Sequence, residues 1–119
     1  MKTWTYFKES EFTCKCGCGL NNISPDLVDK LEEARGMFGR PLHITSGSRC
    51  AAHDRSVGGK SHSAHRTGEA ADIRCATSRD RFKLLNIFFI LGFKRIGIGP
   101  TFIHVDISKT NPPDVTWLY

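Results

Sequence analysis

The sequence lacks a long apolar run. Its longest, Ile87–Leu91, is far shorter than the roughly 20 residues that a helix needs to cross a bilayer. It also lacks the apolar core of a signal peptide, because Met1–Phe7 contains polar residues and charges follow soon after. We therefore expect no membrane partner and a chain that is cytoplasmic as synthesised. Later release by an unrelated route, such as a lysis pore, is left open.

The sequence also lacks a dense basic run, although the formal net charge is +5. The positive residues are scattered, and no Lys/Arg cluster carries interleaved aromatics, so nucleic acid is not favoured as a partner. A basic surface suits an anionic lipid or an acidic cell-wall polymer, or it is simply solvated. With 39% hydrophobic and 24% charged residues, the chain is expected to be globular.

The cysteines do not form a complete pattern. Five cysteines without a signal peptide argue against a full disulfide framework. Cys14, Cys16 and Cys18 alternate with other residues, unlike the two-residue gap of a zinc knuckle, and no second pair completes four ligands. A separate structural metal is therefore the less favoured interpretation. Cys50 and Cys75 each follow a functional-looking segment and could lie close together, and their pairing is left open.

Two helices are indicated. Ser24 is a suitable N-cap, Pro25 suits the first helical position, and apolar residues recur at helical spacing until Gly39. A second helix is expected from Thr77 or Ser78 through Leu91. Its expected buried side consists of Phe82, Leu85, Phe89 and Ile90.

Four short strands are expected, and they cover residues 42–46, 69–74, 95–98 and 102–107. The last two are close enough for a hairpin. The segment up to Asn22 and residues 51–62 read as irregular chain, and the tail from Pro112 reads as an aromatic cover. The sequence therefore predicts one α+β domain over residues 1–119, with a small, largely antiparallel sheet and two main helices.

Two histidines and an aspartate are the candidate metal ligands. His65 precedes Asp72 by seven residues, with Gly68 and small residues between them, and His104 follows on a predicted strand. Imidazole nitrogen and carboxylate oxygen bind zinc, and three protein ligands leave one position open for catalysis. The alternative is that His104 and Asp106 merely form the polar face of a strand. We expect His43 to be structural or exposed.

These residues belong to a longer pattern. Ser63, His65, Gly68, Ala70 and Asp72 resemble the signature of the M15 zinc peptidases. These are D-alanyl-D-alanine carboxypeptidases and L-alanyl-D-glutamate endopeptidases of peptidoglycan. The resemblance is to the short, single-domain branch of the family, of subfamily A type. It extends to Glu11–Phe12 with the Cys/Gly segment, Ser46–Arg49, Val57–Gly59, His104–Asp106 and Trp117–Tyr119.

The resemblance implies a Hedgehog/DD-peptidase-like fold and Zn²⁺ held by His65, Asp72 and His104. It implies a metallopeptidase that cuts peptidoglycan stem peptides, as a carboxypeptidase or an endopeptidase, after release to the cell wall. It also implies Arg49 as a positive group at the substrate, the alternative being a structural ion pair. Ser63 is expected to support a ligand by a hydrogen bond. We expect a monomer.

The sequence departs from the family at one position. Several members carry an acidic general base three residues before the last histidine ligand, where this chain has Thr101. Asp106 is the best substitute as catalytic base, and its alternative role is hydrogen-bond partner to a ligand histidine. Glu69 and His62 are poorer candidates. Thr101 also motivates an alternative function, a zinc-containing cell-wall binding module with lost or weak catalysis.

Overall fold

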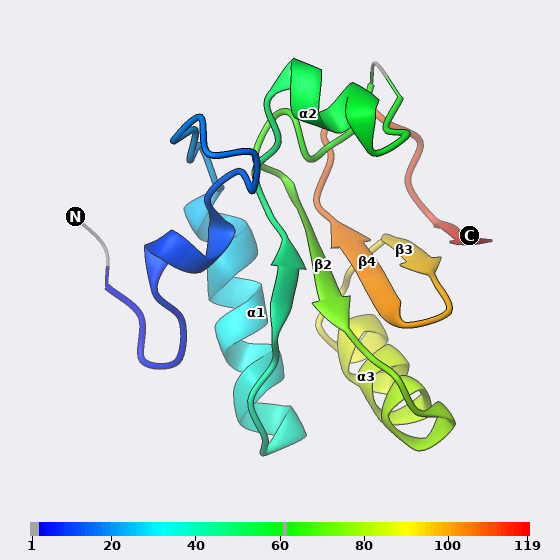
Figure 1. The fold of residues 1–119 in the computed structure, drawn as a ribbon. Coiled ribbons are helices and arrows are strands. Elements are labelled where there is room, and N and C mark those ends of the chain that lie inside the picture. Colours follow the sequence, from blue (N-terminus) through cyan, green and yellow to red (C-terminus); the bar gives the residue numbers. More distant parts are fainter. Residues whose placement is uncertain (1–2, 61) are drawn as a thin grey trace.

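The computed structural model describes residues 3–60 and 62–119 and has an α+β architecture, as expected (Figure 1). Its helices are a short 3₁₀ turn η1 (Glu9–Phe12), α1 (Pro25–Phe38), α2 (Ala51–Ser56) and α3 (Ser78–Ile90). Its strands are β1 (Ile44–Ser46), β2 (Ala70–Arg74), β3 (Arg95–Ile98), β4 (Phe102–Asp106) and β5 (Val115–Leu118). Within these described ranges, no helix is long and apolar enough to cross a membrane.

The strands form one sheet in the order β1-β2-β4-β3-β5. The expected hairpin is present, and every pairing is antiparallel except that of β3 with β5, which is parallel. The tail was expected to be only a cover. It is also a strand, because Val115–Leu118 pairs along the open edge of β3 and so satisfies backbone groups that the edge would otherwise expose.

The helices α1 and α3 pack against each other and share one hydrophobic core with the sheet (Figure 1). The predicted bounds of α1 are confirmed: Ser24 is the N-cap, Pro25 is the first residue, and Gly39 ends the helix with a φ of 79°. From the sheet, Ile103 and Val105 of β4 are fully buried in this core. The residue between them therefore points to the opposite face, where the polar site lies.

Two expectations about the helices are wrong. Residues 51–56, expected to be loop, form α2, with Cys50 as N-cap accepting a hydrogen bond from the His53 N–H. In α3 the buried residues are Leu84, Ile87 and Phe88, with Leu85 partly buried. The other three residues assigned to its buried side are exposed, namely Phe82, Phe89 and Ile90. Because α3 carries apolar residues around most of its circumference, the sequence could not select which side packs against α1 and the sheet.

Candidate metal centre

One row of paired residues crosses all five strands and forms the floor of the candidate site. In order across the sheet, the row is Ser46, Asp72, His104, Gly97 and Trp117. Asp72 and His104 are direct partners on β2 and β4, so the ladder of backbone hydrogen bonds holds their side chains on one face, close together. Gly97 leaves room for the indole, because a Cβ there would lie 2.6 Å from Trp117 Nε1.

His65 comes from the turn before β2 and is attached to the segment after β1. Its Nδ1 lies 2.8 Å from the carbonyl oxygen of Gly47, and its own carbonyl accepts a hydrogen bond from the Arg49 N–H. Its backbone N–H donates to Ser63 Oγ at 3.3 Å. The Ser63 hydroxyl therefore supports the backbone of His65, which agrees with the supporting role expected for it.

The side chains of the three ligands predicted from the sequence meet on this face of the sheet. His104 Nδ1 lies 2.9 Å and His65 Nε2 lies 3.3 Å from Asp72 Oδ1, and all three side chains are buried. The three donor atoms lie within 4.8 Å of one another. A tetrahedral zinc ion with bonds of about 2.0–2.1 Å separates its ligand atoms by about 3.3–3.4 Å. The spacing of the donors is therefore close to what zinc requires.

The hydrogen-bond roles of the rings also fit a cation. The Gly47 carbonyl can only accept, so His65 Nδ1 carries the hydrogen, and Nε2 faces the Asp72 carboxylate with a lone pair. His104 lies between two carboxylates, with Nε2 at 2.6 Å from Asp106 Oδ2. A neutral ring has only one hydrogen for these two contacts. With that hydrogen on Nε2, toward Asp106, the Nδ1 of His104 presents a lone pair to Asp72, as Nε2 of His65 does. Two ring lone pairs and a carboxylate that converge in this way form a donor set that fits zinc.

The contacts between Asp72 and its neighbours shift the pKa values of Asp72 and His104. Burial alone would raise the pKa of Asp72, but its contacts with His104 and His65 hold that pKa well below its usual range. Burial alone would lower the pKa of His104, but its bonds to Asp106 and Asp72 raise it. Asp72 is therefore a carboxylate at neutral pH, which is the form that binds a metal.

Arg49 borders the site and is held by two carboxylates. Its guanidinium lies 3.1 Å from Asp72 Oδ2 and 3.1 Å from Asp54 Oδ1, and its Nε donates to Ser46 Oγ at 2.9 Å. Asp54 is fully buried and also binds Arg66 Nε at 2.7 Å. Sequence reasoning missed Asp54 and Arg66, because it treated residues 51–62 as a loop and no local pattern links these positions to Arg49.

Asp106 lies behind His104. Its Oδ2 contacts His104 Nε2, the ring nitrogen opposite the one at Asp72, and its Oδ1 accepts from Arg95 Nε at 2.8 Å and from the Ser108 N–H at 3.1 Å. The residue is 2% exposed. Burial alone would raise its pKa, but the contacts with His104 and Arg95 lower it. Asp106 is therefore a hydrogen-bond partner of His104, and it also lines the pocket that opens over the candidate ligands.

A pocket of about 670 Å³ opens over these residues. The three candidate ligands line it, and so do the cationic side chains of Arg49, Lys60 and Arg95. His62 and the aromatic rings of Trp117 and Tyr119 form other parts of its wall. Thr101 is exposed in the turn before β4 and is not among the lining residues. Glu69 is also outside the lining and bonds instead to Thr67 Oγ1.

Comparison with known proteins agrees with the geometry. A family model described as Peptidase M15 matches residues 5–106. No curated protein matches the chain. The matched range contains all three candidate ligands together with Arg49 and Asp106. The chain therefore belongs to the peptidase M15 family, a family of zinc-dependent peptidases.

Proposed function

We propose that this chain is a zinc-dependent peptidase that hydrolyses a peptide bond in peptidoglycan stem peptides. One observation carries the proposal: the buried triad of His65, Asp72 and His104 lines a pocket of about 670 Å³. The pocket is large enough for several residues of a peptide. Its cationic lining of Arg49, Lys60 and Arg95 suits the carboxylates of a wall peptide.

The triad would hold zinc through His65 Nε2, Asp72 Oδ1 and His104 Nδ1. Zinc bound there supplies a Lewis acid that polarises a peptide carbonyl and activates water. Arg49 contributes a fixed positive charge. Three of its five N–H donors bind Ser46, Asp54 and Asp72, which leaves capacity for a substrate carboxylate or a developing oxyanion. The rigid attachment of Arg49 means that little side-chain entropy is lost when substrate binds.

From the sequence, Asp106 was expected to be the base that takes a proton from water. Both of its oxygens are engaged, and it lies on the far side of the His104 ring from Asp72. We therefore propose that Asp106 orients His104 and makes it a stronger ligand. His62 lines the pocket from the loop after α2 and is exposed, so it is the next candidate for proton transfer.

The alternative of a binding module without catalysis is not favoured, because the chain belongs to a peptidase family. The argument for that alternative was Thr101 at the position of the usual base. Thr101 lies outside the pocket lining, so its identity says little about proton transfer in this chain.

The proposal is tested by incubating the zinc-loaded protein with purified sacculi and identifying the released peptides by mass spectrometry. We expect cleavage at one type of bond, and the new termini distinguish a carboxypeptidase from an endopeptidase. His104→Ala should abolish release. His43→Ala is the matched control, because His43 is an exposed histidine on the segment before β1, and it should retain activity.

If the zinc-loaded wild type binds sacculi but releases no peptide, the peptidase proposal is wrong and the binding module replaces it. If His104→Ala cuts as fast as the wild type, the metal centre is misassigned. His62→Ala separately tests proton transfer: we expect a fall in kcat with little change in zinc content.

A further inference from the structure

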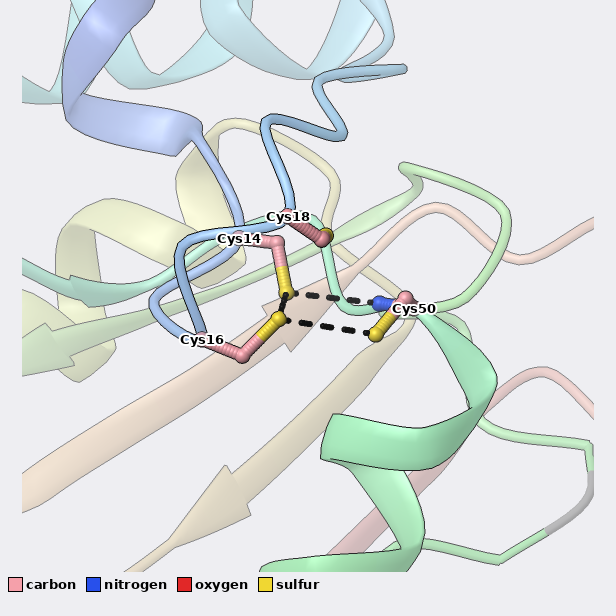
Figure 2. A group of neighbouring side chains, drawn as sticks. All are labelled: Cys14, Cys16, Cys18 and Cys50. Carbon is pink, nitrogen blue, oxygen red and sulfur yellow. Dashed lines mark hydrogen bonds between the residues drawn. The ribbon is translucent and has the colours of Figure 1, made fainter.

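A second group of metal-binding side chains lies outside the peptidase site. Cys14, Cys16 and Cys18 from the N-terminal segment meet Cys50 at the start of α2 (Figure 2). The four Sγ atoms all lie within 4.8 Å of one another, and none of the four cysteines is in a disulfide. Cys50 supplies the fourth ligand that was missing from the sequence pattern. Cys75, which was considered as a partner for Cys50, is instead buried in the hydrophobic core.

The sulfur spacing matches a tetrahedral metal site. Cys14 Sγ lies 3.5 Å from Cys16 Sγ, and Cys16 Sγ lies 3.7 Å from Cys50 Sγ. Zinc–sulfur bonds of about 2.3 Å in a tetrahedron place neighbouring sulfurs about 3.8 Å apart. A disulfide needs about 2.05 Å between two sulfurs, and it would join them in pairs without gathering all four.

The backbone is shaped to gather the sulfurs. Gly17 and Gly19 adopt φ values of 90° and 84°, a conformation that other residues rarely adopt, and they fold the segment back on itself. The Cys14 N–H closes this loop by donating to the Leu20 carbonyl at 2.9 Å. The three cysteines therefore face Cys50 from one compact loop (Figure 2).

Backbone N–H groups also point at the sulfurs. Leu20 donates to Cys18 Sγ at 3.5 Å, Cys50 to Cys14 Sγ at 3.5 Å, and His53 to Cys50 Sγ at 3.4 Å. Such bonds offset the negative charge of thiolates that share one cation, and they orient the ligands. Three N–H···S contacts in one cluster are a reason to expect an ion there, beyond the proximity of the cysteines.

We propose that Cys14, Cys16, Cys18 and Cys50 bind a second zinc ion, which is structural. Four thiolates close the coordination sphere and leave no position for water or substrate, which distinguishes this site from the triad. Binding replaces the thiol protons with the ion and releases up to four of them to solvent, with no change of oxidation state.

The second ion would join the N-terminal segment to the chain that carries the peptidase site. Cys50 directly follows Arg49. Ser48 precedes Arg49, and its N–H donates to the Phe12 carbonyl at 2.8 Å. Gly47, whose carbonyl orients His65, touches the backbone of Phe12 so closely that a Cβ would lie 2.8 Å from it. The cysteine site therefore holds in place the segment that positions both Arg49 and His65.

The test is the zinc content of the full chain, purified without added metal or chelator and measured by elemental analysis. We expect about two zinc ions per chain for the wild type. The double variant Cys16→Ser/Cys18→Ser should lose one of them, and both positions are exposed, so neither substitution removes a core side chain. Cys75→Ala is the matched control and should keep both. His65→Ala should lose the other ion and keep the cysteine-bound one, which separates this proposal from that of the peptidase site.

Cobalt substitution and thiol counting complete the test. The cobalt-loaded wild type should show the visible bands of a tetrahedral cobalt–thiolate site, present in His65→Ala and absent in Cys16→Ser/Cys18→Ser. Denatured protein with chelator and no reductant should titrate as five free thiols, matching the five cysteines of the chain. A zinc content unchanged by the double substitution, a thiol count that reveals disulfides among these residues, or stoichiometric iron in place of the second zinc would each overturn the proposal.

Discussion

Replacing Asp54 with asparagine should destabilise the fold more than any comparable change of a surface carboxylate. Asp54 is fully buried, and its two oxygens bind Arg49 at 3.1 Å and Arg66 at 2.7 Å. Asparagine keeps the shape but offers one acceptor, and its amide N–H₂ must face the other guanidinium. A hydrogen bond to a charged group contributes about 1.5–3 kcal/mol, and breaking a buried ion pair costs about 3–5 kcal/mol.

The two arginines are partly solvated, with side-chain exposures of 15% and 21%, so water replaces some of the lost interaction. We therefore expect Asp54→Asn to lower the free energy of unfolding by about 3 kcal/mol at pH 7, near the low end of the buried-pair range. For a domain of this size, the corresponding fall in Tm is roughly 10 °C. The control is Glu33→Gln on the exposed side of α1, for which a change within about 0.5 kcal/mol is expected.

The loss of stability caused by Asp54→Asn should become smaller as the pH falls. Burial alone would raise the pKa of Asp54, but Arg66 and Arg49 lower it below its ordinary value in the folded protein. The folded carboxylate thus stays ionised where the unfolded one already binds a proton. Its stabilisation is complete above about pH 4 and is lost as pH falls through the lowered pKa. The difference between wild type and Asp54→Asn should shrink in this interval.

Urea unfolding at a series of pH values, followed by tryptophan fluorescence, measures both quantities. A difference below about 1 kcal/mol at pH 7 would show that the charge of Asp54 does not hold the two arginines. A difference that stays constant from pH 7 to the acid limit of folding would contradict the linkage argument.

Three further outcomes are expected. Asp106→Asn should weaken zinc binding at the triad by about 10- to 100-fold in a chelator competition, because it loosens His104; unchanged affinity with abolished turnover would instead identify Asp106 as the base. Gly68→Ala should lower Tm strongly, since φ is 74° and a Cβ would lie 2.0 Å from the Asn22 carbonyl oxygen, whereas Gly36→Ala in α1 meets nothing and should raise Tm slightly. A chelator should abolish peptide release and lower Tm, and added zinc should reverse both; a Tm unaffected by metal would mean that zinc does not stabilise the fold.

Parts of the fold that depend on local chemistry could be predicted from the sequence. The bounds of α1 follow from Pro25 at its first turn and Gly39 at its end, and both lie where expected. The strands β3 and β4 were expected as a hairpin because their connection is short. The three candidate ligands were proposed from their residue types and from the predicted strands that carry Asp72 and His104, and the resemblance to the family then supported them. The spacing of His65 and Asp72 alone is common by chance.

Features that depend on distant packing could not be predicted. Cys50 lies 32 residues beyond Cys18 in the sequence, so nothing local associates it with the cysteine loop. The contact of Asp106 with Arg95 became visible only when the pairing of β3 with β4 placed the two residues side by side. For α3, periodicity was compatible with more than one buried side, and only contact with α1 decided between them.

The row of residues across the sheet makes formation of the metal centre depend on correct strand pairing. Asp72 and His104 are partners in the β2–β4 register, so slipping β4 by one residue would present Ile103 or Val105 to the site and turn His104 toward the core. A misregistered chain thus has no triad, so zinc bound at the triad would favour the native pairing over every competing one by mass action. A zinc ion with a catalytic role in the folded protein would therefore also favour the correct pairing of β2 with β4 during folding.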